Sequence, residues 1–491
     1  MTRMTNYKIL LAVVIACFSI SACSDRNPYS SAYRSDGTIG TYPDYKEVTI
    51  PANIAPLNFH YTGENVSKAV TTFTVGDKSV SIKGIKVEWP LKKWKSFMDG
   101  EEGQTVNVKS EIMLNGQPMT ESWNVYVSED PVDAYLTYRL IEPSFQMFHE
   151  LSLEERCIEN WDKTTFCDYT ITDNSCMNCH IHAQQRGDLS MFYIRGKHGG
   201  AILNRNGELR KLTLNAEGMI SSTVYGEIHP SGQYGVFSTN VILPSLHTAA
   251  YNRMEVYDTA SDLTVADFDH NKMINAPHVA RPDKLETFPC FSADGSQVFY
   301  CVADTVALPN DIQNLRYSLM RADFDTDSGL ISELADTLWS ASAHQGSVCH
   351  PKASPDGKWI MFTVSDYGTF PIDHRESKLY MIDLETGELN SLDGIKSDES
   401  GSDTYHSWSY NSRWIVFASK RGDGQYAKPY LSHIDENGNT SKPFVLPQKS
   451  SRYYELTLKS FNVPDIGTAS SGISRKDSKR MYKSESEVFT R

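Results

Sequence analysis

No run of apolar residues in this 491-residue chain reaches the length of about 18 that marks a membrane-spanning helix. The chain also lacks a Gly-x-Ser-x-Gly elbow, a Walker A loop, a His-Glu-x-x-His helix and the dinucleotide-binding glycine fingerprint. These absences argue against a serine hydrolase, a P-loop NTPase, a zinc protease and a dinucleotide-dependent dehydrogenase. No nucleophile constellation supports a propeller hydrolase either. We therefore expect a carrier or binding protein rather than an enzyme.

Basic residues are in deficit, with 47 Lys and Arg against 61 Asp and Glu. Without the first 22 residues, which contain Arg3 and Lys8, the balance is 45 against 61, a net charge of −16. An acidic surface of this kind argues against nucleic acid and anionic membrane as partners. It is compatible with a basic redox protein as a partner, and solubility alone explains it as well.

Cysteine is scarce for an exported chain, with nine residues in all. Cys157 and Cys167 flank a short loop, and Cys290 and Cys301 stand at the two ends of one expected hairpin. Either pair is close enough in sequence for a disulfide, which would leave Cys349 unpaired. Free buried thiols are an equal alternative.

The N-terminus has the pattern of an export signal. Arg3 and Lys8 precede an apolar run over 9–20, which is too short to span a membrane and fits a signal peptide. The run ends in Ile20-Ser21-Ala22-Cys23, which resembles the bacterial lipobox. That resemblance implies a signal peptide over 1–22 and lipidation of Cys23, followed by a polar tether over 23–46. An ordinary secretory signal with an incidental cysteine is the alternative. We expect an exported bacterial lipoprotein, periplasmic or anchored at the outer membrane or cell surface.

The stretch Cys176-Met177-Asn178-Cys179-His180 has the spacing at which a c-type haem is attached. Two thiols three positions apart can each bond one porphyrin vinyl group, and the adjacent imidazole then ligates the iron. The composition predicts only about 0.005 chance occurrences of this pattern. A zinc site needs a second cysteine pair, which the chain lacks. We expect one covalent haem c on Cys176 and Cys179, with His180 as proximal ligand. A redox or structural disulfide is the alternative.

The other iron ligand is not marked by the sequence. The candidates for this ligand downstream of the motif are His182, Met191, His198, His229 and His247. We favour His247, because it follows an expected strand in a loop that can reach a site between domains. The remaining four are expected to have structural or surface roles.

Two series of turns repeat through the last three-fifths of the chain. One is a tight turn leading into an aromatic and aliphatic strand, centred on Gly232, Gly295, Gly357 and Ser412 at intervals of 63, 62 and 55 residues. The other is a later hairpin turn such as Asn206-Gly207 or Thr386-Gly387. Two hairpins per period predict four-stranded blades of a β-propeller. Five blades are expected at 188–215, 224–275, 285–338, 346–392 and 404–447, with a further blade completed from 125–141 or from strands without a clear signal.

The rest of the chain has a different pattern. Residues 47–141 alternate strand-like runs with Gly- and Asn-containing turns, which predicts a small β-sandwich-like domain. Residues 142–187 form a connector that holds the haem motif in a loop or short helix. The propeller follows over 188–466, and a polar tail without fixed structure over 467–491. The fold class is therefore all-β.

The repeat Ser354-Pro355-Asp356-Gly357 before Trp359-Ile360-Met361-Phe362 resembles TolB-type propellers, which are six-bladed. The motif, the stretch 50–59 and Tyr405-His406-Ser407-Trp408-Ser409 together resemble Bacteroidetes-type lipoproteins with such a propeller and one haem motif. This resemblance implies a lipid-anchored monohaem protein whose propeller docks a protein partner, for electron transfer or haem-based sensing. The alternative is a TolB-like assembly propeller with a structural cysteine pair.

Overall fold

The computed structural model describes residues 39–63, 65–142, 150–246, 254–395 and 401–491, and the side chains of Cys179, Ser245 and Leu246 are outside this description. The expected lipidation residue Cys23, the expected signal peptide and the distal candidate His247 lie outside the described residues. None of the described helices is long and apolar enough to cross a membrane.

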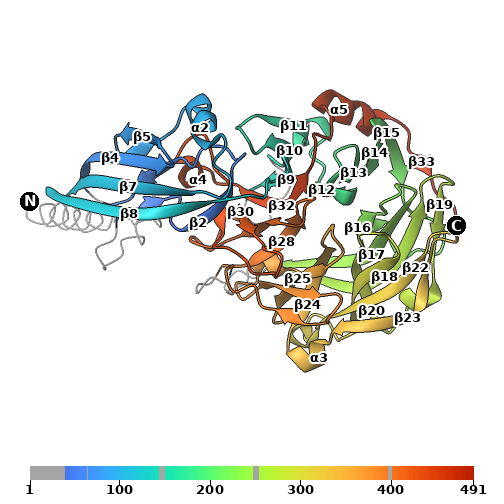
Figure 1. The fold of residues 1–491 in the computed structure, drawn as a ribbon. Coiled ribbons are helices and arrows are strands. Elements are labelled where there is room, and N and C mark those ends of the chain that lie inside the picture. Colours follow the sequence, from blue (N-terminus) through green and yellow to red (C-terminus); the bar gives the residue numbers. More distant parts are fainter. Residues whose placement is uncertain (1–38, 64, 143–149, 247–253, 396–400) are drawn as a thin grey trace, which may run out of the picture.

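An N-terminal module precedes the propeller (Figure 1). Its larger sheet has the order β2-β8-β7-β4-β5, and a smaller sheet has the order β1-β3-β6. The larger sheet comprises β2 (Val48–Pro51), β4 (Val66–Val75), β5 (Lys78–Lys83), β7 (Thr105–Leu114) and β8 (Gln117–Ser128). The smaller comprises β1 (Thr41–Tyr42), β3 (Phe59–Tyr61) and β6 (Lys86–Val87), and helix α2 (Leu91–Met98) follows β6. Alternate residues of β7 are buried, as expected of a sheet with one wet face.

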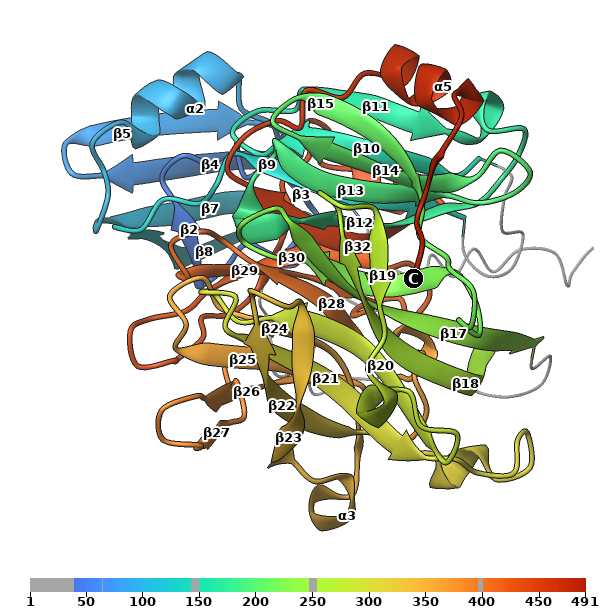
Figure 2. The same ribbon diagram turned by 90° about the vertical axis from the view of Figure 1, so that its right-hand side faces the viewer.

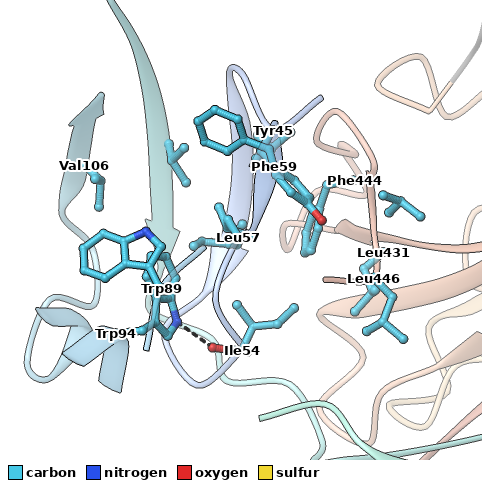
Figure 3. Packing of buried hydrophobic residues seen from close by; sticks show 14 of the residues in the cluster. Tyr45, Ile54, Leu57, Phe59, Trp89, Trp94, Val106, Leu431, Phe444 and Leu446 are labelled. Atoms are coloured by element: carbon cyan, nitrogen blue, oxygen red, sulfur yellow. Dashed lines mark hydrogen bonds between the residues drawn. The ribbon is translucent and has the colours of Figure 1, made fainter. Parts of the chain in front are cut away.

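The module shares its core with the propeller (Figure 3). The Trp94 indole of α2 donates a hydrogen bond of 2.8 Å to the carbonyl of Ile54, which fixes the helix on the sheet. Tyr45 lies against Phe444, with ring centroids 6.5 Å apart. Because one apolar cluster joins the two parts, the module is seated on the propeller rather than tethered to it.

Six four-stranded blades are formed by the described residues after 134. In each blade the first strand named is the innermost and the last is the outermost. Blade 1 contains β32 (Ser460–Gly467), β9 (Tyr135–Ile141), β10 (Ser152–Cys157) and β11 (Lys163–Asp168). Blade 2 contains β12 (Met177–His182), β13 (Leu189–Ile194), β14 (Gly200–Arg205) and β15 (Glu208–Thr213). Blade 3 contains β16 (Thr223–Ile228), β17 (Tyr234–Leu246), β18 (Met254–Asp267) and β19 (Lys272–Ile274).

The remaining blades follow the same plan. Blade 4 contains β20 (Lys284–Phe291), β21 (Gln297–Asp304), β22 (Ser318–Asp325) and β23 (Leu330–Trp339). Blade 5 contains β24 (Ser347–Ala353), β25 (Trp359–Ser365), β26 (Lys378–Asp383) and β27 (Leu389–Asn390). Blade 6 contains β28 (Asp403–Trp408), β29 (Trp414–Ser419), β30 (Lys428–His433) and β31 (Phe444–Val445). Short helices α3 (Ala341–His344) and α4 (Tyr453–Leu456) lie between strands. The all-β propeller predicted from the repeats is confirmed.

The ring closes through the C-terminal part of the chain. Strand β32 pairs antiparallel with β9, so blade 1 combines residues from both ends of the propeller sequence. In Figure 1, β32 lies beside β9 and β12. The sequence had indicated upstream residues for a further blade, and β9 supplies one strand of it.

The polar tail is folded, contrary to expectation. Helix α5 (Arg475–Lys483) begins at a capping box on Ser474 and packs near β11 and β15 (Figure 2), and β33 (Glu487–Val488) adds a parallel strand to blade 2. Phe489 is buried in the core of blades 2 and 3. The composition is polar because only one narrow side of α5 is buried, at Ser478, Met481 and Tyr482.

The innermost strand of every blade has a β-bulge at an equivalent position. In each, two residues oppose one on the next strand, at Cys179–His180, Val224–Tyr225, Phe288–Pro289, His350–Pro351, Tyr405–His406 and Val463–Pro464. Phe288, His350, Tyr405 and Val463 have φ of 50–53°, a conformation that non-glycine residues rarely adopt. The haem motif thus occupies the place where each blade bends at the centre of the ring.

Candidate functional site

The motif lies in β12, a strand, and not in the loop or short helix favoured by the sequence. The bulge at Cys179–His180 breaks the two-residue alternation, and Asn, Cys and His have no strong strand preference. For both reasons the strand leaves little signal. Met177 is buried against Cys167, with Sγ and Sδ 3.0 Å apart. Cys176 is half-buried and faces a cavity.

His180 is buried, with 3 % of its surface exposed. Neither ring nitrogen makes a hydrogen bond of good geometry to a described residue, although the Val463 backbone lies near enough to raise the pKa of the ring. Burial lowers the pKa of His180 to about 4, and the nearby Asp465 carboxylate opposes this shift only in part. The ring is therefore neutral at physiological pH, which is the form that ligates a metal.

A cavity of about 180 Å³ adjoins Cys176. Its polar lining comprises Arg139, Glu142, Asp373, Lys420, Gln425, Ser460 and Asn462, and most of the other lining residues are apolar. Lys420 is already paired with Asp373. Arg139 lies close enough to His180 for its charge to lower the pKa of that imidazole further. Arg139 thus lies close both to the cavity that Cys176 faces and to the His180 ring.

Asp465 of β32 links the strands around His180 through two hydrogen bonds. Its Oδ2 accepts a hydrogen bond of 3.1 Å from the backbone N–H of His182, and its Oδ1 accepts one of 2.6 Å from the hydroxyl of Ser407. Three innermost strands, β12, β28 and β32, are joined by this one carboxylate. The position of His180 thus depends on ring closure.

His182 has a structural role. Its Nε2 contacts the Thr137 hydroxyl at 3.0 Å, and its Nδ1 contacts the Arg186 carbonyl at 3.2 Å. The residue is 6 % exposed, whereas the sequence suggested a position near the haem or at the surface.

The other histidine and methionine candidates lie in structural surroundings. Met191 is buried in an apolar cluster. His198 packs against Tyr482 with ring centroids 5.6 Å apart. His229 contacts the Ser231 hydroxyl at 2.8 Å and the Gly295 carbonyl at 3.2 Å. His247, the favoured residue, lies outside the described part of the chain.

Aromatic side chains from the innermost strands of four blades contact one another. Tyr225 and Phe288 have ring centroids 4.5 Å apart, Phe288 and His350 4.1 Å, and His350 and Tyr405 4.8 Å. All four are bulge residues of innermost strands. The bulges therefore direct rings toward one another across blades 3 to 6.

The described cysteines outside the motif, from Cys157 onward, are free thiols, and Cys167, Cys290, Cys301 and Cys349 are buried. The two suggested disulfides, Cys157–Cys167 and Cys290–Cys301, are absent from the described residues. Cys290 and Cys301 lie within one apolar cluster of blades 4 and 5, where a thiol behaves as a small apolar group.

A haem c requires two thiols, an adjacent imidazole and space for a porphyrin. The Cys176 thiol at the cavity and the unpartnered, neutral His180 ring suit this ligand chemistry. The cavity is smaller than the roughly 300–1,000 Å³ of pockets that hold drug-sized ligands. The two described donor groups, one thiol and one imidazole, therefore suit this chemistry, and accommodating the whole ring requires the side chains of the cavity wall to move apart.

Arg139 and Asn462 were not singled out by the sequence. Each belongs to blade 1, which is completed only when β32 pairs with β9. The available signal was a charged residue at position 139 within the otherwise largely apolar run Tyr135-Leu136-Thr137-Tyr138-Arg139-Leu140-Ile141.

No protein-family model matches this chain, and no curated protein matches it either. Among solved structures, the chain is similar to a puromycin-hydrolysing peptidase of Mycobacterium tuberculosis, with 10 % identity and a TM-score of 0.35 over 82 % of this chain. It spans only 57 % of that peptidase. A quinonprotein alcohol dehydrogenase-like protein of Bacteroides thetaiotaomicron has 9 % identity and a TM-score of 0.33, over 87 % of this chain and 97 % of the other. An oligogalacturonate lyase in complex with manganese has 10 % identity and a TM-score of 0.30, over 77 % and 99 %. These likenesses assign no activity, and the propeller stands on its own sheet topology.

Proposed function

We propose that this chain is an exported monohaem protein in which Cys176 and Cys179 hold the porphyrin and His180 ligates the iron. The observation that supports it best is the buried His180 ring, whose nitrogens have no hydrogen-bond partner of good geometry among the described residues, together with the cavity that Cys176 and Arg139 line. A buried polar group without a partner costs stability, and a ligand that satisfies it recovers that cost.

The chain's own residues supply a suitable setting. A bound haem provides one-electron chemistry or a gas-binding iron. The low pKa of His180 keeps a nitrogen lone pair available. Asp465 and Ser407 fix β12 against its neighbours, so the imidazole is held before any ligand arrives. We infer a redox carrier or sensor whose propeller serves as a docking scaffold for a protein partner, with a lipid on Cys23 holding it to a membrane.

Expression of the exported full-length chain together with a cytochrome c maturation system tests this proposal. We expect a haem-stained band in denaturing gels and a pyridine haemochrome spectrum of two thioether bonds. Cys176→Ser should shift that spectrum to a single-thioether form and lower the yield. His180→Ala should alter the Soret band of the native protein. Cys157→Ser, which removes another half-buried thiol, is the matched control and should retain the wild-type spectrum.

Absence of covalent haem in the wild-type chain would exclude this function. The cysteine pair would then be structural, as in the alternative of a TolB-like assembly propeller. Lipidation is tested separately, because Cys23→Ser should release the exported protein from the membrane fraction.

A further inference from the structure

Arg139 forms no ion pair in the part of the chain that the structure describes. It lies in β9 and lines the cavity beside Cys176. Its Nε is buried without a hydrogen-bond partner, and none of the ion pairs formed by the described residues includes it. Of the other charged residues that line the cavity, Lys420 is paired with Asp373, and Glu142 makes no ion pair in the described part of the chain. The cavity lining thus holds one cation, Arg139, and one carboxylate, Glu142, that form no ion pair among the described residues.

Asn462 stands directly opposite Arg139 on the neighbouring strand. The two residues are register partners of β32 and β9, and both line the cavity. Asn462 is 5 % exposed, and its Oδ1 has no partner among the described residues. Two adjacent strands therefore present the Nε–H donor of Arg139 and the Oδ1 acceptor of Asn462 to the same small space, and neither atom has a hydrogen-bond partner among the described residues. Buried polar groups are ordinarily paired, so this pairing is expected to come from a ligand.

The chemistry of that ligand follows from the donors. Arginine offers a planar fork of N–H groups that matches the two oxygens of a carboxylate. An asparagine amide adds two N–H donors, from which a carboxylate can accept, and one carbonyl acceptor. The cavity, of about 180 Å³, is large enough for a short acid side arm but not for a large planar ring.

We propose that Arg139, with Asn462 opposite it, binds a carboxylate in the cavity beside Cys176. A propionate arm of a porphyrin held on β12 carries this group, and so does a free small organic acid. The first source rests on the proposed function, whereas the second does not. In both, Arg139 is a ligand-binding residue that the motif itself does not reveal.

Iron-free probes test this on the full-length chain produced without a maturation system. Protoporphyrin IX and its dimethyl ester differ only in their free carboxylates, and succinate represents a free acid. Binding of each porphyrin is followed by its fluorescence, and binding of succinate by calorimetry. We expect protoporphyrin IX to bind about tenfold more tightly than its ester, because a hydrogen bond to a charged group exceeds a neutral one by about 1.4 kcal/mol, which is tenfold in affinity.

Substitutions at Arg139 should remove that preference. In Arg139→Gln the acid-to-ester ratio should fall to about one, and Arg139→Lys should lie between, since it keeps the charge but loses the fork. Arg321→Gln is the matched control, because Arg321 pairs with Asp336 on blade 4 away from the cavity. It should retain the wild-type ratio. Far-ultraviolet circular dichroism verifies that each variant is folded.

The outcomes separate the two sources and the two proposals. An acid preference that depends on Arg139 supports the porphyrin arm. Equal porphyrin binding, together with succinate binding that is lost in Arg139→Gln, supports a free acid. No acid preference and no succinate binding in the wild type, or an unchanged Arg139→Gln, overturns the inference. Haem staining is independent of this result. If the protein stains for haem but Arg139→Gln leaves porphyrin and succinate binding unchanged, the haem function stands and the carboxylate site is excluded. If the protein does not stain but succinate binding depends on Arg139, only the carboxylate site stands.

Discussion

His374 contacts Glu255 in a fully buried bridge between two blades. Its Nε2 lies 3.0 Å from Oε1 of Glu255 in β18 of blade 3, and its Nδ1 lies 2.7 Å from Oε1 of Glu376. His374 follows β25 of blade 5, so the bridge spans blade 4 at one face of the ring. The neighbouring Met254 and Asp373 line the Cys176 cavity. The bridge therefore holds part of the wall of the candidate site.

This bridge should make stability depend on pH. Burial alone would lower the pKa of His374, but the hydrogen bonds and charges of Glu255 and Glu376 outweigh it and raise the pKa to about 9. The stabilisation is fully present below the unfolded-state value of about 6.5 and is lost as the pH rises through about 9, with a magnitude of up to about 3 kcal/mol. We expect denaturant unfolding to show this loss between pH 6 and 9.5. His374→Gln should flatten the profile, whereas His344→Gln, at an exposed position, should keep it. An unchanged profile in His374→Gln would contradict this assignment.

Ring closure should depend on Phe461 of β32. The side chain is 1 % exposed and packs on Tyr138 of β9 with ring centroids 4.8 Å apart. Phe461→Ala should lower the free energy of unfolding by about 3–5 kcal/mol. Leu458→Ala is the matched control, since Leu458 is 65 % exposed and should change stability by less than about 0.5 kcal/mol. Equal stability of the two variants would mean that β32 contributes little to the closed ring.

The thiols should differ sharply in reactivity. Burial raises the pKa of Cys290 and Cys301 well above the usual range and that of Cys349 to about 12. Because the thiolate is the reactive form, these residues should resist alkylation in the native, haem-free protein. Cys157 and Cys176 are half-buried and should react first. Peptide mass mapping after alkylation measures each position. All of these thiols should alkylate after denaturation without reductant, and a Cys290–Cys301 disulfide would refute the structure there.

The folded tail should resist proteolysis despite its many basic residues. Helix α5 contains Arg475, Lys476, Lys479, Arg480 and Lys483, all of which trypsin recognises. A structureless tail would be cut within the first minutes of limited digestion, but the packed helix should survive much longer. The contacts of the tail include the buried ammonium of Lys211, which donates to the carbonyls of Tyr482 and Ser484 at 3.0 and 2.9 Å.

A cap substitution provides the test of this packing. Ser474→Ala removes the N-cap of α5 and should cost about 1 kcal/mol, with faster cleavage in the helix. Equally rapid cleavage in wild type and variant would show that the tail is not held.

The turns that repeat along the chain predicted most of the propeller. Gly232, Gly295 and Gly357 have φ of 73–77°, and Ser412 of 58°, as such turns require. Blade 1 was not placed, because its pairing joins β9 with a strand more than 300 residues away and no local signal records that contact. The site was predicted in part: the motif indicated Cys176 and His180, but Arg139 and Asn462 meet only through this distant pairing.

The six innermost strands share one bulge geometry but carry different side chains at it. In the other five blades the bend carries Tyr225, Pro289, Pro351, His406 or Pro464 in the position of His180, so the backbone tolerates very different side chains there. The ring therefore has six equivalent positions at which a ligand-binding residue can be placed without a change of the backbone. Exchanging the bulge residues of two blades is a route by which this scaffold can be given a second site.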